Sequence, residues 1–335
     1  MIAKLWARVR DFVARLFRRA PPAPGRFEAG SRWSITGWLG VAPWILPRRE
    51  YLVYVPRGHS ILRRVPLLVL IHGCRQTPEE IAAATRIAAF ADERGCLVLL
   101  PRQNPHANAW GCWNWFDRPT ARGHGETAIV AAQIRSVRRR YRVDRKRVFV
   151  AGMSSGGALA AALGLRRPGL VAAAIVHSGL ACGAAASPFS ALRVLAEGAD
   201  TDTRGIAAEA RSLAHPGSLP VPLLAIHGGG DEVVRPVNAV HLVRQYLALN
   251  AHPAAALGPE RELPPADAST EAATADLRTV TTSEWRVDGR LVARLVRVDR
   301  LAHAWSGGDD RYPYNDPRPP DACALIAAFV DDVSA

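Results

Sequence analysis

A short glycine-rich motif carries the first residue of this sequence that could act as a nucleophile. Gly152-Met153-Ser154-Ser155-Gly156 fits the pattern G-x-S-x-G and follows the apolar run 148–150. At a sharp turn from a strand into a helix, the serine needs small neighbours because larger ones would collide with the backbone. Such a turn exposes the Ser154 hydroxyl beside free N–H groups at the start of a helix, which can bind an oxyanion. The motif predicts a nucleophilic serine, and the alternative is an ordinary Gly-Ser loop.

A serine hydroxyl is a poor nucleophile unless an oriented base removes its proton. In folds with this strand-turn-helix motif, an acid and then a histidine follow the serine along the chain. Asp231 ends a glycine turn after the expected strand 222–227, with Glu232 as the neighbouring competitor. His303 lies on a loop after the expected last strand 291–298. These positions predict Ser154 as nucleophile, Asp231 as acid and His303 as base.

The same chemistry requires two donors for the oxyanion. One should be the backbone N–H of Ser155, directly after the nucleophile. The second should come from the loop after the expected strand 67–72, where Gly73 gives room for the Cys74 amide to approach. This set needs no metal and no cofactor.

An aromatic cluster could bind the substrate. Trp113, Asn114 and Trp115 lie in an irregular segment, and Trp305 stands two residues after the expected base. Large rings in such places often belong to the core. The sharper interpretation is a flat hydrophobic cleft for an apolar acyl chain.

Strand and helix patterns alternate along most of the chain, which predicts an α/β fold with a doubly wound, mainly parallel sheet. The catalytic domain should cover 51–335 and begin with an edge strand at 51–55. Residues 185–216 read as an inserted helical cap, and 252–278, poor in large apolar residues, as a flexible surface loop.

The first part of the chain has a different character. Residues 2–19 place large apolar side chains on one helical face and arginines mostly on the other, which predicts an amphipathic helix within 1–20. A linker and tryptophan-rich segment should follow at 21–50. The helix could bind a granule or membrane surface, or it could dock on its own domain.

The composition limits the class of protein. The net charge is +13, and residues 1–35 hold eight basic and two acidic residues. No nucleic-acid-binding module is recognisable, so we expect no nucleic acid partner. We expect neither a membrane span nor a signal peptide, because no apolar run is long enough for either. Five widely spaced cysteines show no disulfide framework or zinc pattern, which favours a reducing, cytoplasmic location. Whether Cys74 and Cys112 pair stays open.

Several motifs occur in an order that resembles a known family. They are His72-Gly73-Cys74-x-Gln76-Thr77, Cys112-Trp113-Asn114-Trp115-Phe116, the G-x-S-x-G motif with Gly157, His227-Gly228-x-x-Asp231, and His303-Ala304-Trp305. Over about residues 50–330 the chain is similar to the catalytic domain of short-chain-length polyhydroxyalkanoate depolymerases, the poly(3-hydroxybutyrate) depolymerase family. The resemblance implies an α/β-hydrolase fold, the roles given above for Ser154, Asp231, His303 and the Cys74 amide, and cleavage of poly- or oligo(3-hydroxybutyrate).

The expected activity is therefore that of a serine esterase at the surface of intracellular granules. Feruloyl and acetylxylan esterases share much of the motif set, so an esterase of that type is the alternative. A serine peptidase of the same fold is a weaker alternative, because nothing in the sequence selects it. A non-catalytic surface-coating protein is also weaker, because a complete and correctly ordered triad argues against it.

Overall fold

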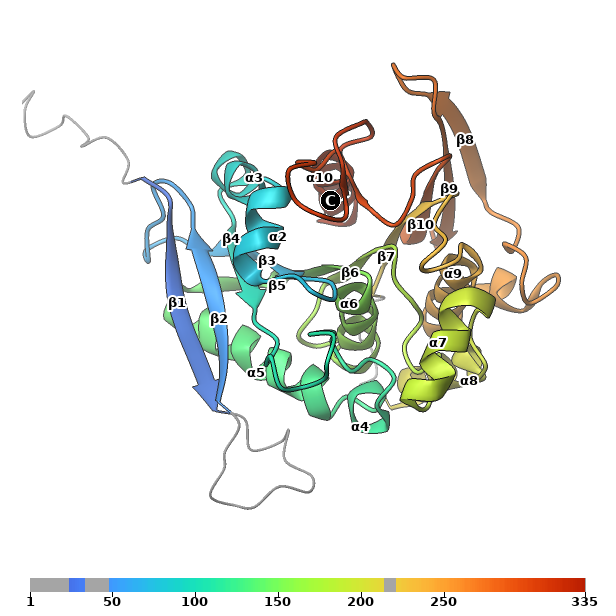
Figure 1. Ribbon diagram of the computed structural model, residues 1–335, viewed down its shortest axis with the longest axis horizontal. Coiled ribbons are helices and arrows are strands. Elements are labelled where there is room, and N and C mark those ends of the chain that lie inside the picture. Colours follow the sequence, from blue (N-terminus) through green and yellow to red (C-terminus); the bar gives the residue numbers. More distant parts are fainter. Residues whose placement is uncertain (1–23, 34–47, 214–220, 335) are drawn as a thin grey trace, which may run out of the picture.

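The structure is a computed structural model that describes residues 24–33, 48–213 and 221–334. The amphipathic helix predicted over 2–19 and most of the tryptophan-rich segment lie outside these residues. Figure 1 shows one twisted sheet running through the molecule, with β1 at one end and β8 at the other.

In the described part of the chain, ten strands form this sheet in the spatial order β1-β2-β4-β3-β5-β6-β7-β10-β9-β8. Their bounds are β1 Arg26–Trp33, β2 Arg48–Val55, β3 Val65–Ile71, β4 Leu97–Pro101, β5 Val143–Met153, β6 Ala173–His177, β7 Leu223–Gly228, β8 Ala268–Ala273, β9 Thr279–Val287 and β10 Arg290–Val298. The strands from β4 to β10 in this order pair in parallel, and the pairs at either end are antiparallel. The predicted doubly wound, mainly parallel sheet is confirmed.

Helices cover both faces of the sheet. Their bounds are α2 Pro78–Ala84, α3 Ile87–Arg94, α4 Arg118–Ala121, α5 Gly125–Arg140, α6 Ser155–Arg166, α7 Pro188–Glu197, α8 Thr203–Ser212, α9 Val237–Leu249 and α10 Ala322–Ser334. Side chains of α5, α6 and α9 form one core cluster with Leu67 and Val69 of β3. Leu68 and Leu70, on the opposite face of the same strand, pack in a second cluster with α3 and α10. Because helices cover both faces of β3, side chains on both sides of the strand are buried, and the strand is apolar throughout.

The chain reverses direction across the sheet at β3. It passes from β3 to β4 on one side and returns to β5 on the other side, so β3 lies between them. In open α/β sheets the crevice outside the carboxyl ends of the strands at such a switch point is the usual ligand site. The turn after β3 and the turn after β5 therefore meet at the edge of the sheet where chemistry is expected.

Two segments differ from their predicted character, and a third, the helical cap, is helical as expected. The segment 21–50 contains β1 and the start of β2, and because β1 pairs with β2, the expected edge strand 51–55 lies inside the sheet. The loop expected at 252–278 contains β8, which is paired with β9. The cap expected at 185–216 consists of α7 and α8 as far as the structure describes it. β8 contains no large apolar residue and is exposed at every position, which is why its sequence resembled a loop.

None of the helices in the described ranges combines the length and the apolar character that crossing a membrane requires.

Candidate active site

The turn around Ser154 has the strained geometry that the glycine motif predicts. β5 ends at Met153, α6 begins at Ser155, and Ser154 between them has φ 55° and ψ −121°. A Cβ on Gly152 would lie 2.3 Å from the Gly156 carbonyl oxygen, and a Cβ on Gly156 would lie 2.3 Å from the Ile71 carbonyl oxygen. Only glycine fits at both places, because the atoms in the way belong to the backbone. Ser154 is thus held at the carboxyl end of β5 by local geometry.

Asp231 and His303 meet although 72 residues separate them. The His303 Nδ1 lies 2.8 Å from the Asp231 Oδ2, while the other carboxylate oxygen accepts hydrogen bonds from the Val233 and Val234 amides at 3.0 and 2.8 Å. Burial acts to raise the pKa of Asp231, but the hydrogen bond and the charge of His303 lower it below its usual value. The carboxylate is therefore ionised at neutral pH and fixes the His303 Nδ1 as a donor, so the Nε2 is free to act as a base.

Ser154 and His303 line the same cavity, which has a volume of about 620 Å³. Cys74 and Ser155 line it too, and most of its wall is apolar. Since Asp231 is bonded to His303, the fold brings together at one cavity the elements that carry all five residues predicted for catalysis.

The Glu232 alternative is not supported by this geometry. Glu232 is exposed to solvent, whereas the Asp231 carboxylate is buried and hydrogen-bonded to His303. Asp231, the last residue of the glycine turn, is therefore the carboxylate that is bonded to the proposed base His303.

The loop after β3 is held in a tight turn beside the serine. The Gly73 amide donates to the Gln76 Oε1 at 2.9 Å, and the Arg75 amide donates to the Trp110 carbonyl at 3.0 Å. The amides on either side of Cys74 are thus occupied by protein acceptors. Ser155 begins α6, where the first amides have no acceptor within the helix. This arrangement is compatible with the predicted Cys74 and Ser155 donors, whose role remains a prediction.

A disulfide joins this loop to the aromatic segment. Cys74 and Cys112 are bonded, with a Cα–Cα distance of 4.1 Å. Cys96, Cys182 and Cys323 are buried free thiols. The structure thereby decides the pairing that the sequence left open. It also removes the cysteine argument for a reducing compartment, since disulfides persist mainly in oxidising ones.

We expect the disulfide to stabilise the fold substantially. It closes a loop of 38 residues, and a double variant Cys74→Ala/Cys112→Ala should lower the free energy of unfolding by about 3 to 4 kcal/mol. Urea unfolding of both proteins with and without a thiol reductant measures this. The reductant should destabilise the wild type and leave the double variant unchanged. If the wild-type protein has the same unfolding midpoint with and without the reductant, the prediction is contradicted.

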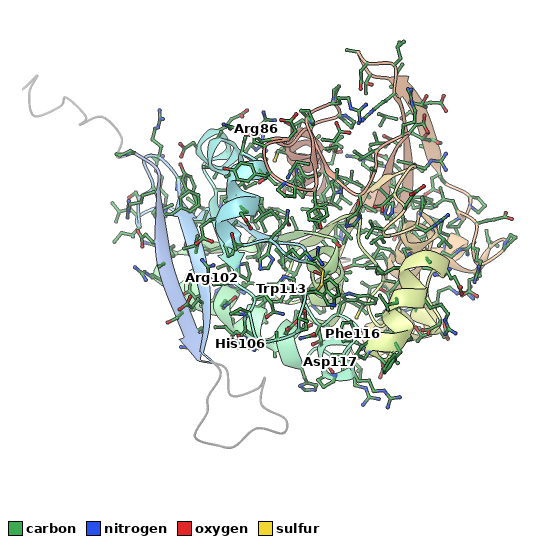
Figure 2. All side chains as sticks on the ribbon, in the orientation of Figure 1. Arg86, Arg102, His106, Trp113, Phe116 and Asp117 are labelled. Carbon is green, nitrogen blue, oxygen red and sulfur yellow. A yellow bond between two sulfur atoms is a disulfide. The ribbon has the colours of Figure 1, made fainter. Side chains whose placement is uncertain are left out.

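Two of the predicted substrate-binding tryptophans are core residues. Trp113 and Trp305 are each 1 % exposed, and neither lines the cavity. The Trp305 ring stacks on the buried His177 ring, with centroids 5.0 Å apart. The Trp113 Nε1 donates to the His72 carbonyl at 3.0 Å, in the interior of the molecule (Figure 2). The predicted position of both rings in the substrate cleft was wrong.

The other two predicted residues do reach the cavity. Asn114 and Trp115 line it, together with Phe116. A buried carboxylate that sequence reasoning missed fixes Asn114. The Glu126 Oε2 accepts from the Asn114 amide at 2.6 Å, and the Oε1 accepts from the Asn114 side chain at 3.0 Å. Burial raises the pKa of Glu126. This bonding makes Asn114 a rigid part of the cavity wall.

The cavity mouth carries large apolar side chains that the sequence did not single out. They come from four separate segments, and each is at least 40 % exposed: Trp110, Phe189, Leu192, Val233 and Tyr314. Phe189 and Leu192 lie one turn apart on α7. Their spacing in a predicted helical cap was the only sequence signal that could have indicated them.

Two buried histidines around the site should make stability depend on pH. Burial lowers the pKa of His72 to about 4 and that of His177 to about 3, so both are neutral in the folded protein. The unfolded chain takes up these protons near pH 6.5, so the stabilisation is complete above that pH and is lost as the pH falls. Between pH 7 and pH 5, we expect each histidine to lower the free energy of unfolding by about 2 kcal/mol.

Urea unfolding at the two pH values measures this loss. His106→Gln, at an exposed position, should leave the pH dependence as it is. Equal unfolding free energies at pH 7 and pH 5 would contradict the expectation.

Comparison with known proteins gives the site its family context. The family model "Esterase PHB depolymerase" matches residues 49–262. Poly(3-hydroxyalkanoate) depolymerase C of Paucimonas lemoignei is 28% identical over 195 residues, which is 58% of this chain and 46% of that protein. Feruloyl esterase B of Neurospora crassa is 29% identical over 43% of this chain and 50% of that protein. The chain thus spans about half the length of these curated relatives.

Solved structures support the fold. The acetyl xylan esterase from Aspergillus awamori superposes with a TM-score of 0.60 at 20% identity, over 76% of this chain and 89% of that one. A ferulic acid esterase superposes with a TM-score of 0.52 at 16% identity, over 93% and 99% of the two chains. The predicted α/β-hydrolase fold is confirmed. Since the family model covers more than half of the sequence, this chain belongs to the PHB depolymerase family of esterases.

Proposed function

We propose that this protein is a serine esterase with Ser154 as nucleophile, His303 as general base and Asp231 as the orienting acid. The observation that carries the proposal is the 2.8 Å hydrogen bond between Asp231 and His303 at a cavity that His303 shares with Ser154 on its strained turn.

The residues fit an acyl-enzyme mechanism. The Ser154 oxygen forms a bond to the ester carbonyl carbon while its proton passes to the His303 Nε2. The Cys74 and Ser155 amides stabilise the negative carbonyl oxygen. His303 then gives the proton to the departing alcohol, and the acyl group stays on Ser154. A water molecule, deprotonated by His303, attacks the acyl carbon, and the acid leaves as Ser154 regains a proton.

For the substrate, we propose ester bonds of poly- or oligo(3-hydroxybutyrate). The family match and the apolar cavity wall support a short, largely aliphatic acyl unit. A feruloyl or acetylxylan esterase is the second candidate. The relatives with 29% identity that bear the names feruloyl esterase B and acetylxylan esterase A favour it as strongly as the depolymerase favours the first.

Purified protein should be compared on amorphous poly(3-hydroxybutyrate) granules, 3-hydroxybutyrate trimers, methyl ferulate and acetylated xylan. We expect the highest kcat/KM on the trimers and release of 3-hydroxy acids from the granules, with Ser154→Ala as background. A preference for ferulate or acetylxylan would select the second candidate. If the wild type and Ser154→Ala act equally on every ester, the esterase proposal fails.

We also propose that residues 2–19 attach the protein to a granule or membrane surface, a role that rests on their amphipathic sequence pattern alone. Removing residues 1–20 should abolish sedimentation with granules and keep hydrolysis of soluble trimers. Loss of both would mean that the segment supports the fold, and loss of neither would reject surface binding. Fractionation of cells that express the full chain tests the cytoplasmic location predicted from the sequence, against which the Cys74–Cys112 disulfide stands.

A further inference from the structure

Tyr314 stands beside the proposed base, and neither the sequence motifs nor the mechanism above uses it. Its ring meets the His303 ring edge-on, with centroids 6.3 Å apart and an interplanar angle of 77°. The side chain lines the cavity that contains Ser154 and remains 40 % exposed. A half-exposed aromatic ring in this place can contact a bound molecule on the side of the base.

The backbone at Tyr314 is unusual for a tyrosine. It has φ 63°, in the left-handed region that glycine and asparagine occupy readily and bulky residues rarely do. The Tyr314 carbonyl accepts the Trp305 amide at 2.8 Å, which ties it to the strand that follows His303. Backbone strain of this kind is found mainly at functional sites, so it points to a role for this position of the loop.

The surrounding loop is anchored so that this conformation persists. Two short strands, β11 (Trp305–Ser306) and β12 (Asn315–Asp316), pair in parallel on either side of the turn. Asp316 forms an ion pair with Arg278, whose side chain is almost fully buried. Arg86, labelled in Figure 2, donates to the Gly307 carbonyl from the turn between α2 and α3. These contacts hold the backbone of the loop that runs from Trp305 to Asp316 and carries Tyr314.

The role of His303 as the base indicates which part of the substrate lies near the Tyr314 ring. His303 must give its proton to the oxygen of the departing alcohol, so that oxygen lies next to its Nε2. The carbonyl oxygen points away, toward the amide donors. Substrate groups attached to the alcohol oxygen consequently extend on the side of His303, and Tyr314, whose ring lies against His303, lines the cavity there.

We propose that Tyr314 is the specificity-determining residue for the alcohol portion of the ester, which its ring contacts through apolar surface. The inference rests on the proposed esterase function and deepens it. In a polyester, this portion is the remainder of the chain beyond the bond that is cleaved.

Two ester series test the inference. One keeps acetic acid and varies the alcohol through methyl, propyl and hexyl, and the other keeps propanol and varies the acid through acetic, butanoic and hexanoic. Tyr314→Asn removes the ring and tolerates the left-handed backbone. We expect kcat/KM to fall about tenfold on hexyl acetate and less than about threefold on methyl acetate, because only the longer alcohol loses apolar contact. Along the acid series the loss should be the same small factor throughout.

Matched variants separate the ring from its surroundings. Tyr314→Phe should keep the wild-type dependence on alcohol length. Tyr312→Asn, a tyrosine in the same loop that does not line the cavity, should leave both series unchanged. An equal loss for Tyr314→Asn on all esters would mean that the ring only positions His303, and no loss would mean no contact; either result overturns the inference. Failure of the esterase proposal is recognised separately, as hydrolysis that survives in Ser154→Ala, and would overturn both.

Discussion

Ser154→Ala should lose nearly all ester hydrolysis, with kcat/KM falling by about 10⁴-fold or more. The variant lacks the only atom proposed to bond to the acyl carbon. What remains is substrate binding and stabilisation of the oxyanion, which in serine hydrolases that lack a triad member still gives about a 10³- to 10⁴-fold acceleration over water. Kinetics on 3-hydroxybutyrate trimers and p-nitrophenyl butyrate measure the loss, and mass spectrometry after a fluorophosphonate probe should find the label on Ser154 in the wild type alone.

The fold should survive this change. The Ser154 amide donates to the His177 carbonyl at 3.0 Å, and that bond does not involve the side chain. Alanine occupies the strained turn as readily as serine, so unfolding by urea should shift little. Ser212→Ala, on the exposed end of α8, is the matched control and should keep full activity. If Ser154→Ala folds and still cleaves esters at the wild-type rate, the assignment of the nucleophile is wrong.

Asp231→Asn should lower kcat by about 10⁴-fold at neutral pH. The ionised Asp231 accepts a hydrogen bond from the His303 Nδ1–H, which keeps that proton on Nδ1 and leaves the Nε2 free to take the proton from Ser154. An asparagine can keep the bonds from the Val233 and Val234 amides through its oxygen, and its NH₂ group then faces His303. The imidazole would turn its Nδ1 lone pair toward that donor and carry its proton on the Nε2, where a base is needed.

The pH profile separates this effect from a loss of structure. If the wrong tautomer is the cause, the activity of Asp231→Asn should recover in part at high pH, while thermal unfolding should resemble that of the wild type. Asp288→Asn, at the exposed turn between β9 and β10, is the control and should retain the wild-type rate. A variant with more than a tenth of the wild-type activity at pH 7 would show that another carboxylate, with Glu232 as the nearest, can orient the base.

Much of the candidate active site could be predicted because local patterns indicate the chain positions of its residues. The turn at Ser154 needs glycine at positions 152 and 156, since any Cβ there would meet backbone atoms, and that requirement is visible in the sequence. Asp231 and His303 could be placed because each follows a strand of a parallel sheet. The carboxyl ends of such strands share one edge, so chain order and loop position were sufficient.

The tryptophans show where this reasoning ends. Trp113 and Trp305 stand in motifs next to functional residues, yet they fill the core, while Trp110 lies exposed at the cavity mouth. The sequence around an aromatic residue looks the same whether its ring faces solvent or the interior. The packing of neighbouring segments decides whether the ring is buried. The burial of Glu126 beneath Asn114 depends on the same long-range packing.

The sequence by itself determined the fold class, the strained serine turn and the positions of Asp231 and His303 after their strands, because these follow from backbone sterics and strand periodicity over a few residues. Only the tertiary structure decided that Cys74 bonds to Cys112, that β1 pairs with β2, and that the Tyr314 ring lies beside the His303 ring. Each of these contacts joins segments whose separation is set by the path of the whole chain. Local patterns carry no information about that distance.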